Sequence, residues 1–171
     1  MIKLKQYTIA VLVNNQFGVL NRVTSMFRRR QFNISALSVS ETESIEYSRI
    51  TVTFDGEELS KQQLVNQLYK LPDVVSIKDF SDQSSLSFDL LLIKMKNEPA
   101  TREEIRAAAQ AFNAEIVDYY KDSMTFRLTD NPRRIDDFIN LMRDYTILEI
   151  CRSGSVSLEK GSTTIKQIIN L

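Results

Sequence analysis

A short stretch near the N-terminus holds groups that could bind a small anion. Asn15 precedes the isolated Gly18, and an apolar pattern of helical spacing begins at Val19. The first N–H groups of a helix have no acceptor within the helix, and the helix dipole adds partial positive charge there. Because Gly18 has no Cβ, a carboxylate could approach the N–H groups of Gly18, Val19 and Leu20 closely. The side chains of Asn15 and Asn33, the latter just before the next apolar stretch, could add hydrogen bonds to it.

The same residues also have ordinary structural explanations. Asn15 could simply cap the helix, Gly18 could permit a turn, and Asn33 could shape a loop, since caps and turns favour these residue types. The three arginines at 28–30 are typical of a solvated helix end that is stabilised by the C-terminal dipole. The pattern by itself therefore leaves an anion site and a plain strand-to-helix connection both open.

Composition argues against several other classes of function. Acidic and basic residues number 22 each, so the charge balance gives no sign of a nucleic-acid or membrane partner. There is no histidine, the four glycines form no phosphate-binding motif, and the single cysteine excludes a CxxC metal site. Cys151 lies in an apolar strand pattern and is predicted to be a core thiol. With no disulfide and no apolar run near ~18 residues, we expect a cytoplasmic protein.

Hydrophobic periodicity predicts the element order βαββαβ for the first half of the chain. The first helix should bury a face formed by Val19, Leu20, Val23, Met26 and Phe27. A second helix is expected near Ser60, which would be its N-cap, with Leu59 and Leu64 in contact and Pro72 ending it. Strands are expected at residues 7–13, 34–40, 48–54 and 74–80.

The same order recurs in the second half. Helices are expected after Thr101 and after the Asn131–Pro132 pair, and strands at residues 87–96, 115–120, 123–129 and 146–154. The sequence therefore predicts an α+β protein with two ferredoxin-like βαββαβ units, each with two helices on one face of an antiparallel sheet and the other face open. The expected divisions are a domain at 1–80, a polar linker at 81–85 and a second domain at 86–171.

These residues, taken in order, resemble a known family. The stretch from residue 11 to residue 39 is similar to the N-terminal ACT domain of the acetolactate synthase small subunits, which carries N-x-x-G-x-L-x-R, F-x-x-R and N-I-x-S-L. The similarity continues through residues 48–54, 63–80 and 152–158, and so covers nearly the whole chain. Gln31 and Ala36 depart from the family pattern. The matching residues are Asn15, Gly18, Leu20, Arg22, Phe27, Arg30, Asn33, Ile34 and Leu37.

The resemblance implies a regulatory subunit with no catalytic residues, cofactor or metal of its own. Its partner would be an acetolactate synthase catalytic subunit that holds thiamine diphosphate, FAD and Mg, which it would activate and make sensitive to valine or a related branched-chain amino acid. Effector sites of the family lie between paired ACT domains, which implies a homodimer. The effector carboxylate would then meet Asn15 and the Gly18, Val19 and Leu20 backbone, and Asn33 and Ile34, from either protomer, would complete the site.

Three alternatives remain at this point. A stand-alone ACT-domain sensor of amino acids could regulate another enzyme or transcription. A ferredoxin-like sheet could bind RNA, although neither strand at 48–54 nor that at 123–129 supplies the glycine–aromatic run of an RNA-recognition motif. An enzyme could work with carboxylates, but the acidic pairs at 103–104 and 136–137 lie near helix starts, where acids favour the dipole.

Overall fold

The computed structural model describes residues 5–80 and 85–167, and the chain divides into two compact units. The first unit combines the residues up to Ser87 with those from Ser155 onward, and the second is Phe88–Gly154. Of the expected linker, residues 81–84 lie outside the described part, and Ser85 begins a strand. Each unit has two helices and an antiparallel sheet, which confirms the predicted α+β class with two βαββαβ units.

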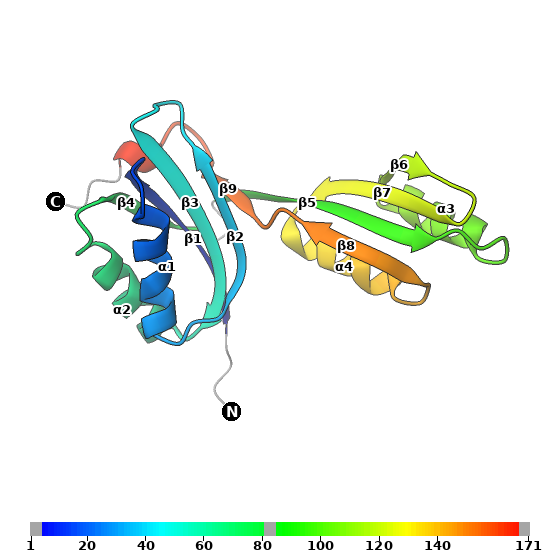
Figure 1. Ribbon diagram of the computed structural model, residues 1–171, viewed down its shortest axis with the longest axis horizontal. Helices are drawn as coiled ribbons and strands as arrows, with labels where there is room; N and C mark the ends of the chain where they lie inside the picture. The colour runs from blue at the N-terminus through cyan, green and yellow to red at the C-terminus, as the bar shows by residue number, and fades with distance from the viewer. Residues whose placement is uncertain (1–4, 81–84, 168–171) are drawn as a thin grey trace. The chain divides into compact units, whose positions relative to one another are not determined.

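The first unit places two helices on one face of a four-stranded sheet (Figure 1). The sheet order is β2-β3-β1-β4, with every neighbouring pair antiparallel. The elements are β1 (Lys5–Asn14), α1 (Val19–Arg29), β2 (Ile34–Glu41), β3 (Tyr47–Gly56), α2 (Glu58–Leu68) and β4 (Val74–Asp79).

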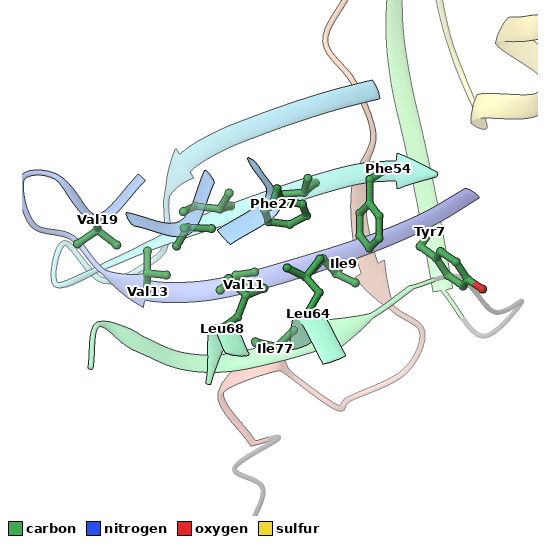
Figure 2. Packing of buried hydrophobic residues seen from close by; sticks show 13 residues of the cluster. Tyr7, Ile9, Val11, Val13, Val19, Phe27, Phe54, Leu64, Leu68 and Ile77 are labelled. Atoms are coloured by element: carbon green, nitrogen blue, oxygen red, sulfur yellow. The ribbon is translucent and has the colours of Figure 1, made fainter. Parts of the chain in front are cut away.

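Alternating side chains of the two central strands form the core of this unit. Ile9, Val11 and Val13 of β1 are at most 1% exposed, as are Val52 and Phe54 of β3. Helix α1 adds Val19, Val23 and Phe27 of its predicted face, and α2 adds two leucines, as Figure 2 shows. Leu20, also expected on that face, is 40% exposed. Burying each such side chain contributes about 1.5–3 kcal/mol, so this face fixes the pose of α1 and of the loop before it.

The start of helix α2 differs from the prediction. The helix begins at Glu58 rather than after Ser60, and its first turn has no side-chain cap. Leu64 is fully buried whereas Leu59 is 66% exposed, so of these two leucines only Leu64 belongs to the core. Strand β3 extends to Gly56, two residues beyond the expected strand end, and the helix begins at Glu58 directly after the Glu57 that follows it.

The second face of the first sheet is not open. Strand β9 (Val156–Glu159), which the pattern did not predict, belongs to this unit together with a 3₁₀ turn at Ile165–Gln167. Arg49 donates to the Ser157 carbonyl, and Lys78 forms an ion pair with Glu159 at 3.0 Å. The chain's own C-terminal segment therefore lies against this face, where the expectation of an open surface is wrong.

The second unit repeats the plan with a sheet of order β6-β7-β5-β8. Strand β9, which pairs with β5, belongs to the first unit together with the first residues of β5, up to Ser87. Leu91 and Ile93 point to the core under the helices, whereas Leu90 and Leu92 on the other face are each 38% exposed. Cys151 of β8 is exposed, so the prediction of a core thiol is wrong. It lies opposite Leu92 on that outer face. The elements are β5 (Ser85–Lys96), α3 (Arg102–Ala111), β6 (Glu115–Tyr119), β7 (Ser123–Asp130), α4 (Pro132–Met142) and β8 (Ile147–Arg152).

Candidate functional site

The entrance of helix α1 is open, as an anion site requires. Gly18 is the residue before the helix and has a left-handed backbone, with φ of 81°, which side chains rarely tolerate. No side chain caps the helix. The Val19 N–H makes only a long bond of 3.4 Å to the Gln16 carbonyl, and the first helical bond runs from the Arg22 N–H to the Gly18 carbonyl at 3.0 Å. Within the described residues, the Leu20 N–H has no acceptor, so it is available to a ligand.

Asn15 does not cap this helix. Its side-chain amide donates to the Ile45 carbonyl at 3.1 Å and to Glu41 Oε1 at 3.3 Å, and its oxygen accepts from the Ser48 hydroxyl at 2.9 Å. The Asn15 backbone N–H also donates, to the Glu46 carbonyl at 2.8 Å. Asn15 thus ties the loop before α1 to the turn between β2 and β3, and its amide would reach a ligand only by giving up one of these bonds.

The Arg22 side chain lies beside the start of helix α1, although Arg22 is not among the effector-binding residues predicted from the sequence. One of its guanidinium nitrogens forms an ion pair with Asp73 at 2.8 Å, and the other is 3.7 Å from the position that a Cβ on Gly18 would occupy. The carboxylate of Asp73 is only 11% exposed, so it holds the guanidinium in place. The signal was present in the sequence, because Arg22 is four residues after Gly18, one helical turn along the same face.

Asn33 and Ile34 lie at the other end of α1 from Gly18. Helix α1 has 11 residues, which at about 1.5 Å per residue separates its ends by about 16 Å. Ile34 pairs with Phe54, and Figure 2 shows Phe54 and Val19 towards opposite ends of the core. One chain therefore does not bring the two halves of the predicted site together.

Apolar side chains surround the entrance and the free edge of β2. Phe17, next to Gly18, is fully exposed, and Ile45, whose carbonyl accepts from Asn15, is 79% exposed. On β2, an edge strand, Leu37 and Val39 are 37% and 44% exposed. Exposed apolar residues beside an unpaired strand edge are typical of a surface that binds another chain or a ligand.

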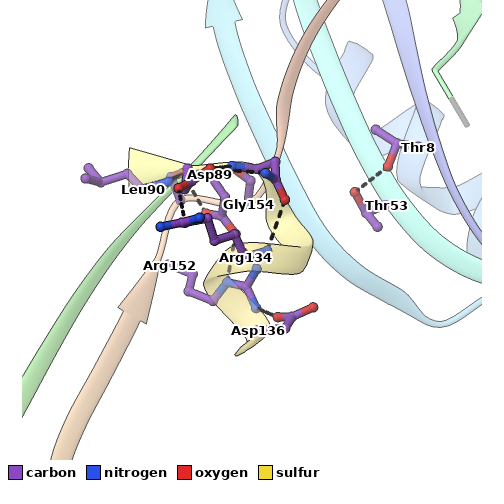
Figure 3. A network of polar contacts seen from close by, with 11 residues as sticks. Thr8, Thr53, Asp89, Leu90, Arg134, Asp136, Arg152 and Gly154 are labelled. Atoms are coloured by element: carbon purple, nitrogen blue, oxygen red, sulfur yellow. Dashed lines mark hydrogen bonds and ion pairs between the residues drawn. The ribbon is translucent and has the colours of Figure 1, made fainter. Parts of the chain in front are cut away.

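Arg152 and Ser153, which begin the C-terminal stretch of similarity to the family, have a structural role in the second unit. Arg152 holds the buried Asp89 through its Nε at 2.7 Å and also reaches Asp136 of α4 at 2.7 Å (Figure 3). Burial opposes the charge on Arg152, but the hydrogen bonds to Asp89 and Asp136 outweigh it and raise the pKa of the guanidinium. Ser153 accepts from the Leu90 N–H at 3.0 Å. These contacts close the end of the second unit, and nothing in them resembles a reactive group.

The described part of the chain shows two further features that bear on function. It contains no group of three or more acidic, cysteine or histidine side chains arranged to hold a metal ion. Among the helices that the structure describes, none has the length and apolar character needed to cross a membrane.

Comparison with known proteins covers both units. Residues 9–76 match the family model of the acetohydroxyacid synthase (AHAS) small subunit-like ACT domain, and residues 89–161 match that of the small subunit of acetolactate synthase. A probable acetolactate synthase small subunit of Archaeoglobus fulgidus is 39% identical over 92% of this chain and 98% of its own length. The acetolactate synthase small subunit of Bacillus subtilis is 38% identical over 90% of each chain.

A solved structure agrees with both matches. The crystal structure of the acetolactate synthase small subunit of Thermotoga maritima superposes with a TM-score of 0.81 at 27% identity, over 93% of this chain and 99% of that chain. The similarity therefore includes the order of the two units and the strand β9 region, where the second family model also ends. The chain belongs to the family of acetolactate synthase small subunits.

Proposed function

We propose that this chain is the regulatory, non-catalytic subunit of a thiamine-diphosphate-dependent acetolactate synthase. It would bind the catalytic subunit, raise its activity and make it sensitive to inhibition by valine or another branched-chain amino acid. Thiamine diphosphate, FAD and Mg would be held by the catalytic partner, in the cytoplasm. Membership of the small-subunit family and the lack of a concentrated set of catalytic side chains in the sequence support this assignment.

The observation that carries the effector proposal is the uncapped start of α1 at Gly18. A carboxylate there would accept from the Val19 and Leu20 N–H groups and meet the positive end of the helix dipole. The Arg22 guanidinium beside Gly18 would add positive charge at short range. An aliphatic side chain would find Phe17 and the exposed Leu20 nearby.

The second half of the site would come from another copy of the chain. Asn33 and Ile34 lie at the far end of α1, so an antiparallel approach of two copies through their β2 edges would place them beside the partner's helix entrance. Leu37 and Val39 would then be covered in a homodimer. An effector that bridges two copies would favour one dimer arrangement over another by its differential affinity, with a coupling of about 1–3 kcal/mol.

The test is to mix the chain with a candidate catalytic subunit and to assay acetolactate formation with and without valine. We expect higher activity with the chain present and inhibition by valine. Gly18→Asp, which adds negative charge at the helix entrance, should still activate but should no longer respond to valine. If the chain activates the enzyme but none of the branched-chain amino acids inhibits it, the sensor function is refuted and the subunit assignment stays intact.

A stand-alone amino-acid sensor that acts on another enzyme or on transcription is the second candidate. It shares the same effector site and differs only in its partner. Copurification of the tagged chain from its own cells separates the two, because a large thiamine-diphosphate enzyme should be recovered only in the first case. Valine binding with no such enzyme in the eluate would favour the second candidate.

A further inference from the structure

A pocket of about 430 Å³ lies within the first unit, between the second face of its sheet and the C-terminal segment. All of its lining residues belong to this unit, and it is separate from the entrance of α1. Leu12 and Phe80 contribute an apolar floor from the sheet side, and Leu158 and Ile165 contribute from the C-terminal segment. This volume is in the range of pockets that hold small organic molecules.

The charged groups of the pocket are nearly all paired with one another. Glu159 pairs with Lys78 through both carboxylate oxygens, at 3.0 and 3.1 Å. Glu43 pairs with Lys166 at 2.6 Å. Among the described residues no carboxylate lies within ion-pair distance of Arg49, which leaves it as the cation of the pocket without an anion.

Glu41 adds the third carboxylate of the lining. One of its oxygens accepts from the Asn15 amide at 3.3 Å, outside the pocket's ion pairs. Ser48, the neighbour of Arg49, also bonds to Asn15. The strand ends that carry Glu41 and Arg49 are therefore held in place by the same loop.

Arg49 is placed to bind an anion. Its guanidinium lies over the Phe80 ring, 5.4 Å from the ring centroid, and one nitrogen donates to the Ser157 carbonyl. Burial lowers the pKa of Arg49, with nearby Glu43 acting in the opposite direction. A guanidinium has five N–H donors in a planar fork, so a single carbonyl acceptor leaves donors free for a carboxylate.

We propose that this pocket binds a small aliphatic carboxylate, with Arg49 holding the acid group and Leu12 and Phe80 contacting the hydrocarbon. The partly desolvated guanidinium gains an anion, and the apolar floor accepts a short branched chain. The ligand would join the sheet to β9, because Arg49 already bonds to the Ser157 carbonyl. This site does not depend on the proposed valine site, since it uses other residues and a different face.

Isothermal titration of the full chain with isovalerate tests the proposal. We expect one site per chain, with affinity reduced about tenfold or more in Arg49→Gln, the loss expected for a hydrogen-bonded charge. Arg49→Lys keeps the charge but loses the fork, and should weaken binding by a smaller factor. Arg143→Gln, in an exposed arginine of the second unit, is the matched control and should bind as wild type does. The uncharged analogue 3-methylbutan-1-ol should bind far more weakly.

Hydrogen exchange locates the ligand independently of any substitution. Isovalerate should slow amide exchange in Val156–Glu159, and Gly18→Asp should leave both the affinity and this protection unchanged. Equal affinity in wild type and both Arg49 variants would overturn the proposal, as would the absence of binding at millimolar isovalerate. Loss of isovalerate binding in Gly18→Asp, with Arg49→Gln unaffected, would place the carboxylate at the helix entrance instead and would equally overturn it.

Discussion

The Ser48 hydroxyl on β3 donates to the Asn15 side-chain oxygen at 2.9 Å, which joins the loop before α1 to the β2–β3 turn. The Asn15 amide adds bonds to the Ile45 carbonyl and to Glu41. Gly18 is three residues away, so the position of the helix entrance depends on a side chain that does not itself need to touch the effector. Asn15 therefore has a positioning role in addition to any direct contact.

Replacement of Asn15 by alanine should loosen this loop. We expect a loss of about 1 kcal/mol in the free energy of unfolding, because two of these hydrogen bonds are exposed and the one from Ser48 is only partly buried. Valine affinity, measured by isothermal titration, should fall severalfold. Asn140→Ala, at an exposed position of α4, is the control: it should leave valine affinity unchanged and should not lower the free energy of unfolding, because alanine favours a helix more than asparagine does. Unchanged valine affinity in Asn15→Ala would mean that the loop keeps its position without the tie to Ser48.

Removal of Arg152 should destabilise the second unit strongly. The Asp89 side chain is 1% exposed and is paired with Arg152 at 2.5 Å, so Arg152→Ala would leave a buried carboxylate without its cation, with only the Ser153 hydroxyl donating to it at 3.2 Å, at a cost of about 3–5 kcal/mol. Asp136 is 56% exposed, and its removal should cost less than about 1 kcal/mol. Urea unfolding curves measure both. Asp89→Asn combined with Arg152→Ala should recover part of the loss, since no charge is then buried.

A cluster on α2 and β4 should make the first unit sensitive to alkaline pH. Lys61 lies 2.6 Å from Glu58 and 2.5 Å from Asp79, with its ammonium over the Tyr7 ring. Burial opposes its charge, but the hydrogen bonds to Asp79 and Glu58 outweigh it and raise the pKa of Lys61. Burial also raises the pKa of Tyr7.

Because the pKa of each group is higher in the folded state than in the unfolded state, both groups stabilise the folded state at any pH below their unfolded-state pKa values. This contribution is lost as the pH rises through their folded-state pKa values. We therefore expect the free energy of unfolding to fall above about pH 10, near the unperturbed values of tyrosine and lysine. Lys61→Met should be less stable than wild type at neutral pH, and the difference should shrink in the alkaline range. Urea unfolding at neutral and alkaline pH measures it. A constant difference across that range would show that the ion pairs do not cause the effect.

How much the sequence could predict depended on whether a feature is local. The face of α1 containing Val23 and Phe27, and the alternation of Ile50 and Val52 in β3, follow from spacing alone, and both are buried as expected. The cap at Asn131 is also local, and its side chain accepts from the Arg134 N–H at 3.0 Å. Such features involve residues at most a few positions apart, which a pattern can show.

Features that join distant segments could not be predicted in this way. Strand β9 has only four residues, too few for their alternation to predict a strand, and it is stabilised by pairs such as Lys78 with Glu159, which are 81 positions apart. Cys151 has apolar neighbours in sequence but lies on the outer face of a sheet, because its strand register, rather than its neighbours, sets its exposure. The pocket around Arg49 likewise needs all four strands of the first sheet and the C-terminal segment together.

The separation of Gly18 from Asn33 along α1 gives the sharpest test of a shared effector site. If each site takes its entrance from one copy and Asn33 from the other, then a homodimer of Gly18→Asp has two damaged sites, and so does a homodimer of Asn33→Asp. A mixed dimer of the two variants must contain one doubly damaged site and one intact site. Differently tagged chains, refolded together and purified through both tags, should bind one valine per dimer with wild-type affinity. If the mixed dimer binds none, Gly18 and Asn33 act within one chain and the shared site is overturned. If instead the Asn33→Asp homodimer binds valine as wild type does, Asn33 lies outside the site, and the entrance of α1, about 16 Å away, binds the effector without it.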